Sequence, residues 1–101
     1  PVGAIEKVLK KTGWTADEVD LWEINEAFAM VTMAAMDAFN LDEAKVNVNG
    51  GACALGHPLG SSGSRIIVTL IHALQRTGGK KGIAALCIGG GEATAIAVEL
   101  V

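Results

Sequence analysis

The sequence contains few aromatic residues, and this scarcity limits how a core can be built. Aromatic side chains make up 4% of the 101 residues, although hydrophobic residues as a whole make up 50%. The core must therefore consist of Ala, Val, Ile, Leu and Met side chains, which suits helices packed closely on a sheet. A chain of this length forms at most one domain and is long enough to bury its own core.

Long basic or apolar runs are also missing. The formal net charge is −3, and the longest Lys/Arg runs are the pairs at 10–11 and 80–81, so no nucleic-acid partner is expected. No apolar run approaches the length needed to cross a bilayer, so we expect no membrane association. Cysteine is rare, and Cys53 and Cys87 lie far apart in apolar or glycine-rich surroundings. This favours reduced thiols in a cytoplasmic protein over a disulfide.

Secondary-structure signals alternate along the chain. They predict the order helix, strand, helix, strand, helix, strand, strand, over about residues 1–13, 19–24, 26–39, 45–49, 64–77, 82–88 and 93–101. Gly13 and Gly78 stand where helices commonly end, and Asn25 can cap the second helix. Such alternation predicts an α/β fold, with a parallel sheet joined by right-handed crossovers.

Glycine, in contrast, is abundant and clustered. Eight of the thirteen glycines fall within residues 50–63 and 89–91, and such clusters are typical of a backbone that approaches a ligand closely. Ligands of α/β sheets bind at the carboxyl ends of strands. Asn25, His57 and Gly89 all follow directly after predicted strands or their loops, so we expect the site there.

The first glycine cluster surrounds a single histidine. Gly51 and Gly56 have the spacing of a phosphate-binding loop, but His57 and Pro58 follow where that loop needs Lys and Ser or Thr. His57 precedes a helix N-terminus, whose dipole favours the neutral imidazole that can act as a base or a hydrogen-bond donor. The alternative is a structural or surface histidine without a chemical role.

Cys87 and Asn25 also have two interpretations each. Cys87 is a small hydrophobic residue of a core strand or, because three glycines with uncovered N–H groups follow it, a reactive thiol beside an oxyanion hole. Asn25 is a helix cap or a catalytic amide.

Three motifs together carry a family resemblance. "EINEAFA", "NVNGGACALGHPLGSSGSR" and "CIGGG", at residues 23–29, 47–65 and 87–91, resemble the C-terminal catalytic half of thiolases, a family that includes acetyl-CoA acetyltransferases and 3-ketoacyl-CoA thiolases. The resemblance covers practically the whole chain, so residues 1–101 are expected to be the thiolase C-terminal domain within a longer protein. Ketoacyl synthases share the wider fold but usually have a second histidine where Cys87 stands.

The resemblance implies roles for individual residues. Asn25 would hold a water that, with His57, forms an oxyanion hole for the thioester oxygen, and His57 would also activate the acyl-accepting cysteine. Cys87 would be the acid/base at the α-carbon, and Gly89 would supply an N–H to a second oxyanion hole. Ala27 and Phe28 would line the pantetheine tunnel. CoA thioesters would be the substrates, with no metal or redox cofactor.

The resemblance also implies what lies outside this sequence. Thiolases carry their nucleophilic cysteine in an N-terminal half, so that half is an expected partner, and the full-length enzyme is expected to be a homo-oligomer. The fold would be a mixed, mostly parallel sheet with helices on both faces, lacking its first, central strand. The isolated chain would then be an unstable monomer without activity. The alternative is a non-catalytic module that binds acyl-CoA or associates with a thiolase.

Overall fold

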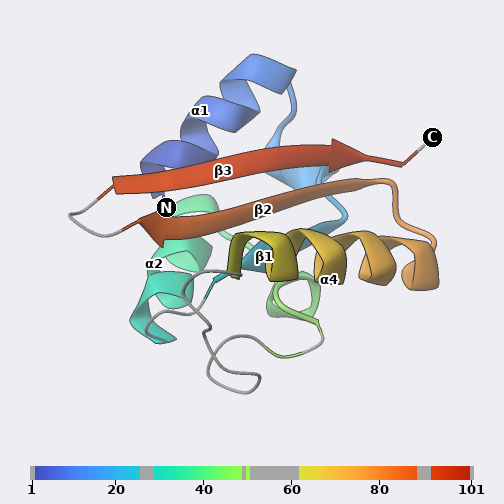
Figure 1. Cartoon of the computed structure of the whole chain (residues 1–101). Helices are drawn as coiled ribbons and strands as arrows, with labels where there is room; N and C mark the ends of the chain where they lie inside the picture. Colours follow the sequence, from blue (N-terminus) through green and yellow to red (C-terminus); the bar gives the residue numbers. More distant parts are fainter. Residues whose placement is uncertain (1, 26–28, 49, 51–61, 89–91, 101) are drawn as a thin grey trace.

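The computed structural model of the chain describes residues 2–25, 29–48, 50, 62–88 and 92–100. In these residues, helices cover both faces of a three-stranded sheet (Figure 1). The strands are β1 (Leu21–Ile24), β2 (Lys81–Ile88) and β3 (Glu92–Glu99). The helices are α1 (Val2–Thr12), α2 (Ala29–Phe39) and α4 (Ser62–Thr77). Two short 3-10 turns span Ala16–Glu18 and Glu43–Lys45.

The sheet is mixed, as the family resemblance implies. Strand β1 runs parallel to β2, in a register that pairs Leu21 with Gly82 and Ile24 with Ala85. Strand β3 is antiparallel to β2, and the pairing of Ile88 with Glu92 closes a hairpin over the glycines at 89–91. Glycine suits such a short connection because it adopts backbone conformations that other residues avoid.

Alternate residues of the strands contact different helices. Trp22, Ile24 and Ile83 belong to a buried cluster that includes residues of α1 and α2. Leu21 and Ala84 belong to a second cluster, whose other buried members come from α4. The sheet is therefore the middle layer, with α1 and α2 on one face and α4 on the other, because side chains alternate across a strand.

Helix α1 follows the predicted pattern. Ile5 is fully buried in the first cluster, and Val8 and Leu9 pack against the same cluster from one face of the helix. Gly13 has a φ of +74° and its N–H donates to the Leu9 carbonyl at 2.9 Å. This left-handed residue ends the helix, since glycine takes that conformation without steric cost.

Helix α4 lies very close to β2. A Cβ atom added to Gly82 would be only 2.8 Å from Cδ1 of Leu70, so a larger residue fits there only if the Leu70 side chain shifts. Leu70 and Leu74 are buried against the sheet, and the helix ends before Gly78, which has a φ of +77°. The predicted end of this helix is confirmed.

The strand expected at residues 45–49 is absent from the described part of the chain. Glu43–Lys45 form a 3-10 turn, and Val46 makes a single parallel bridge to Trp22. Asn47 then turns away with a φ of +48°. A left-handed residue cannot continue an extended strand, so the β-branched pattern of this segment gave the wrong prediction.

The expectation that a central strand is missing is also wrong. Strand β2 is the middle strand, and it is hydrogen-bonded directly to β1 on one side and to β3 on the other. No gap separates these neighbours, because the register between β1 and β2 is continuous from Leu21 to Ile24. Any further strand must add at an outer edge of this sheet.

A substitution of Gly82 tests the close approach of α4. We expect Gly82→Ala to lower the free energy of unfolding by about 1–3 kcal/mol, because the new methyl group overlaps the buried Leu70 side chain. Gly3→Ala is the matched control, since a Cβ atom there meets nothing within 4 Å in helix α1. The control should be neutral or slightly stabilising, and equal urea midpoints for the two variants would contradict this packing.

Asp20 joins the starts of β1 and β2. Its Oδ2 accepts hydrogen bonds from the N–H groups of Lys81 and Lys80, at 2.9 and 2.8 Å. These two backbone donors, that of Lys81 first, hold the pKa of the Asp20 carboxyl below its ordinary value. A carboxyl with a lowered folded-state pKa stabilises the fold above its unfolded pKa, and this contribution disappears as the pH falls through the folded pKa.

Asp20→Asn should therefore flatten the loss of stability in acid. The wild-type chain should lose about 1 kcal/mol more than the variant between pH 6 and about pH 3, a small amount because Asp20 is solvent-exposed. Asp17→Asn is the control, because within the described residues no hydrogen bond involves the Asp17 side chain. If the free energy of unfolding, measured with urea, falls with pH equally in wild type and Asp20→Asn, the hydrogen bonds of the Asp20 carboxylate make no such contribution.

Candidate active site

The carboxyl ends of β1 and β2 lie side by side and bring two predicted site residues to one edge of the sheet. Asn25 follows β1 directly, and its N–H donates to the carbonyl of Ala85 in β2 at 2.8 Å. Cys87 is two residues beyond Ala85 and pairs with Ala93 of β3. Neighbouring strands are about 4.8 Å apart, so the backbones of Asn25 and Cys87 belong to the same small region.

The Asn25 side chain is inside the protein. Its residue is only 1% exposed, and Oδ1 accepts a hydrogen bond of 3.4 Å from Nη2 of Arg65. The predicted role of Asn25 as a helix cap involves residues 26–28, which lie outside the described residues. The contact with Arg65 shows that the amide is held by a side chain of α4 across the sheet surface.

Arg65 also pairs with Glu23, and neither residue was among the predicted site residues. Nη1 of Arg65 lies 2.9 Å from Oε1 of Glu23, whose side chain is 2% exposed. Polar residues that alternate with apolar ones in a strand usually face solvent, but this face of β1 is covered by α4. A buried carboxylate requires such a partner because an unpaired buried charge is very costly.

A sequence signal for this pair exists. Arg65 is the only charged residue of the stretch 47–65, and Glu23 is the only charged residue of β1. Isolated opposite charges in two otherwise uncharged segments are candidates for a buried pair, since buried charges are normally paired. Their meeting across 42 positions could not be inferred from local patterns.

Asn47 braces the end of β1 immediately before Asn25. Its side-chain Oδ1 accepts from the Ile24 N–H at 2.8 Å, and its Nδ2 donates to the Ile24 carbonyl at 2.9 Å. Thr32 of α2 donates to the same carbonyl at 3.5 Å. One amide side chain thus does what a neighbouring strand residue would do, satisfying both backbone groups of Ile24.

Several predicted site residues lie outside the described residues. These are Ala27, Phe28, His57 and Gly89. For Cys87 the structure describes the backbone in β2 but not the side chain. The predicted placement at strand carboxyl ends is therefore confirmed for Asn25 alone, and the backbone of Cys87 lies beside it.

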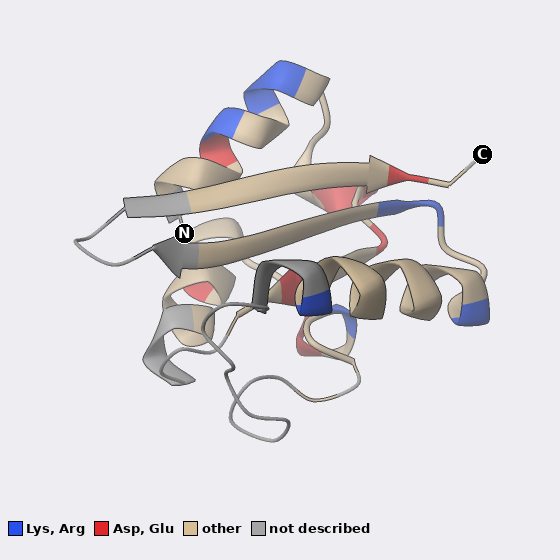
Figure 2. Cartoon of the chain, in the orientation of Figure 1, with Lys and Arg blue, Asp and Glu red and all other residues tan. Residues whose placement is uncertain are grey.

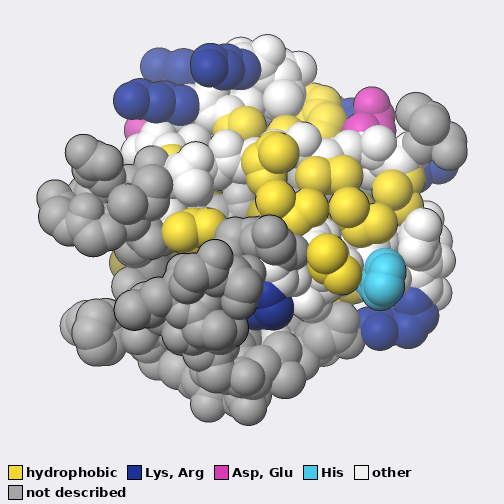
Figure 3. All heavy atoms as spheres, viewed as in Figure 1, with side chains coloured by type: hydrophobic (Ala, Val, Ile, Leu, Met, Phe, Trp, Pro, Cys, Tyr) yellow, Lys and Arg dark blue, Asp and Glu magenta, His cyan; other side chains and the backbone are white. Residues whose placement is uncertain are grey.

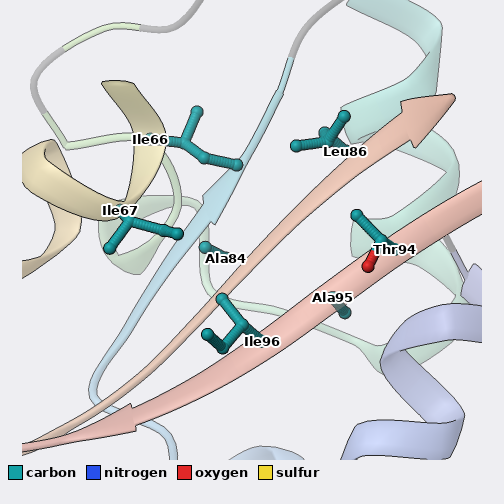
Figure 4. Close-up of a pocket in the computed structure, with 7 residues that line it drawn as sticks. All are labelled: Ile66, Ile67, Ala84, Leu86, Thr94, Ala95 and Ile96. Carbon is teal, nitrogen blue, oxygen red and sulfur yellow. The ribbon is translucent and has the colours of Figure 1, made fainter. Parts of the chain in front are cut away.

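An apolar hollow lies on the α4 face of the sheet, away from these polar contacts. It has a volume of about 210 Å³ and is lined by Ile66, Ile67, Ala84, Leu86, Thr94, Ala95 and Ile96 (Figure 4). Figure 3 shows hydrophobic side chains gathered on this side of the molecule. Val68 and Ile96 are 51% and 46% exposed. The described lining of the hollow is aliphatic apart from the hydroxyl of Thr94. The hollow therefore suits the packing of apolar groups, and its described lining has no side chains that could catalyse a reaction.

Charged residues are distributed rather than gathered. In Figure 2, basic segments occur on α1, at both ends of α4 and at the start of β2, without a continuous basic stripe over the part drawn in colour. Nucleic-acid modules usually present such a stripe. Among the described residues, no helix combines the length and hydrophobicity required to span a membrane.

Replacing Asn47 tests the brace on β1. Asn47→Ala should lower the free energy of unfolding by about 1–3 kcal/mol more than Asn40→Ala, because it removes the acceptor of the buried Ile24 N–H and the shorter of the two hydrogen bonds to the Ile24 carbonyl. Asn40 is the matched control, since its φ of +52° resembles the +48° of Asn47. Both alanines bear the same backbone strain, so equal losses in urea unfolding would rule out the brace.

Comparison with known proteins places this geometry in a family. The sequence profile described as "Thiolase, C-terminal domain" matches residues 1–100. Cytosolic acetyl-CoA acetyltransferase of Mus musculus is 56% identical over 99 residues, which are 98% of this chain and 25% of the relative. Acetyl-CoA acetyltransferase of Chromobacterium violaceum shows the same identity and the same coverage. The chain therefore spans about a quarter of the length of these curated relatives.

Solved structures agree with the sequence comparison. The Bacillus anthracis acetyl-CoA acetyltransferase superposes with a TM-score of 0.96 at 50% identity, covering 100% of this chain and 26% of that protein. Human mitochondrial 3-ketoacyl-CoA thiolase in complex with CoA superposes with a TM-score of 0.95 at 50% identity and the same coverage. The chain belongs to the thiolase family and corresponds to its C-terminal domain.

Proposed function

We propose that this chain is the catalytic C-terminal part of a CoA-dependent thiolase, an acyltransferase that condenses acetyl-CoA or cleaves 3-ketoacyl-CoA. The observation that carries the proposal is that the backbones of Asn25 and Cys87 lie near the carboxyl ends of two directly paired parallel strands. A Claisen reaction needs a base near a carbon acid and hydrogen-bond donors near the oxygen that gains charge. Adjacent strand ends can supply both.

In this proposal Cys87 exchanges the proton. Its thiolate takes a proton from the α-carbon of acetyl-CoA, and the electron pair of the broken C–H bond moves onto the thioester oxygen as an enolate forms. In thiolysis the Cys87 thiol returns the proton to that carbon. Deprotonation of a weak carbon acid is possible only if the enolate oxygen is stabilised as it forms.

Asn25 and His57 stabilise that oxygen in the proposed site. Asn25 acts through a bound water and His57 acts directly, while the N–H of Gly89 serves a second oxyanion hole. Ala27 and Phe28 contact the pantetheine arm. These assignments rest on the motifs. The human 3-ketoacyl-CoA thiolase solved in complex with CoA supports CoA thioesters as the class of substrate.

The rest of the catalytic machinery is proposed to come from sequence beyond this chain. Its relatives are about four times longer, and in the family the nucleophilic cysteine belongs to an N-terminal half. We therefore expect the isolated chain to be inactive and the complete enzyme to be a homo-oligomer. The name of the mouse relative, a cytosolic enzyme, supports a cytoplasmic location.

The alternative function is a non-catalytic module that binds acyl-CoA or associates with a thiolase. The two functions differ in covalent chemistry. A thiolase of native length forms an acyl-enzyme with acetyl-CoA, whereas a binding module retains acyl-CoA without acyl transfer.

Replacing Cys87 tests the proposed acid/base. In the protein of native length, Cys87→Ser should slow deuterium exchange at the acetyl α-carbon of acetyl-CoA by at least about a hundredfold, because a serine hydroxyl is a far weaker acid than a thiol. The same substitution at Cys53, which has no proposed role, should change the rate little. Exchange at the wild-type rate in Cys87→Ser would show that another group is the base.

A further inference from the structure

A single guanidinium bridges two residues on the same face of β1. Nη1 of Arg65 lies 2.9 Å from Oε1 of Glu23, and Nη2 lies 3.4 Å from Oδ1 of Asn25. Glu23 and Asn25 are two positions apart, so the alternation of the strand turns both toward α4. The planar fork of arginine can reach both groups at once, which a lysine ammonium on one flexible stem cannot do in the same geometry.

The two residues that accept hydrogen bonds from Arg65 are buried. Glu23 and Asn25 are 2% and 1% exposed, and the Arg65 side chain is 19% exposed. Burial of this kind weakens solvent screening and fixes the side chains, but it rarely yields much net stability. Buried ion pairs can often be replaced by apolar residues of similar volume with no loss of stability. Stability alone is therefore a weak reason for a charged pair here.

Within the described residues the hydrogen bonding of Arg65 is incomplete, which also argues against a purely stabilising role. Nε is buried and has no hydrogen-bond partner in the described part of the chain, although both Nη atoms are engaged. A buried donor without a partner costs free energy. The position of the guanidinium thus satisfies the contacts of its two Nη groups with Glu23 and Asn25, but it leaves the Nε donor without a partner among the described residues.

We propose that Arg65, anchored by Glu23, is a positioning residue that sets the orientation of the Asn25 amide. The inference rests on the proposed function, because Asn25 acts in that site. A guanidinium only donates, so the group it faces must be the acceptor Oδ1. The amide donor Nδ2 lies in the same plane on the other side of the Cβ–Cγ bond, so it points away from Arg65. From there it donates to the water that stabilises the enolate oxygen.

Replacement of both charges separates positioning from charge compensation. The double variant Glu23→Leu with Arg65→Met removes the buried pair without leaving an unpaired charge. It should fold with a similar urea midpoint but slow deuterium exchange at the acetyl α-carbon of acetyl-CoA by up to about a hundredfold, the scale expected for a misplaced group. The KM for acetyl-CoA should change little, and all measurements use the protein of native length.

A matched control removes a different ion pair. Lys81 and Glu18 are 3.1 Å apart at the opposite end of β2. Glu18→Leu with Lys81→Met makes the same chemical change far from Asn25, and it should leave the exchange rate unchanged. If both double variants slow exchange equally, the effect is a general loss of charge and the inference is overturned.

Coupling to Asn25 gives the decisive readout. Asn25→Ala alone should slow exchange, and adding the Glu23 and Arg65 substitutions should slow it no further, because residues that act through one group are not additive. Multiplicative effects would mean that Arg65 acts independently of Asn25, which overturns the inference while the proposed function stands. An unaltered rate in Asn25→Ala would instead refute the role of Asn25 and, with it, the inference.

A conservative variant covers the case in which the double variant does not fold. Arg65→Lys keeps a positive charge for Glu23 but not the fork that reaches Asn25. It should retain the wild-type urea midpoint and still slow exchange, with no additional loss in the background of Asn25→Ala. Wild-type exchange in Arg65→Lys would show that charge alone is sufficient and would overturn the inference.

Discussion

The direct parallel pairing of β1 with β2 is the constraint on which the rest of the structure depends. Strand β1 has only four residues, all of them buried. So few ladder hydrogen bonds cannot fix its position alone, and contacts beyond its two ends are needed. The ladder to β2 extends past both of its ends, through the Asp20 N–H to the Lys81 carbonyl and the Asn25 N–H to the Ala85 carbonyl. If this register slipped by one residue, Glu23 would turn from Arg65 into the apolar face.

Polar side chains complete what this short strand lacks. On its outer side, Asn47 satisfies the backbone of Ile24, so β1 is paired there without a full neighbouring strand. On the α4 face, Arg65 neutralises Glu23 and contacts Asn25. Each contact joins segments that are distant in sequence, and together they fix the position where Asn25 leaves the sheet. A site built in this way is preorganised by its scaffold before any substrate arrives.

Much of the fold follows from local patterns. The helix that buries Ile5, the helix ends at Gly13 and Gly78, and the two successive strands β2 and β3 are set by periodicity and by the positions of glycine. These features need no knowledge of distant contacts, so the sequence predicts them. The strand expected near Val46 failed because β-branched residues favour extended backbone only until a left-handed residue such as Asn47 interrupts it.

Features that depend on distant contacts could not be predicted. The position of Asn25 at a strand end follows from local signals, but its contact with Arg65 joins residues 40 positions apart. The order of the strands in the sheet likewise cannot be read from any single segment. The expectation of a missing central strand came from the family resemblance and not from the residues. The apolar run of β2 is equally compatible with different neighbours, and only the three-dimensional pairing identifies β1 and β3.

The most direct test of this account is a crystal structure of the native-length protein with acetyl-CoA bound. The account predicts the thioester at the carboxyl ends of β1 and β2, with its oxygen joined through a water to Nδ2 of Asn25. Oδ1 of Asn25 should still face Arg65, as it does here. Acetyl-CoA bound away from these strand ends, or an Asn25 amide turned away from Arg65, would contradict it.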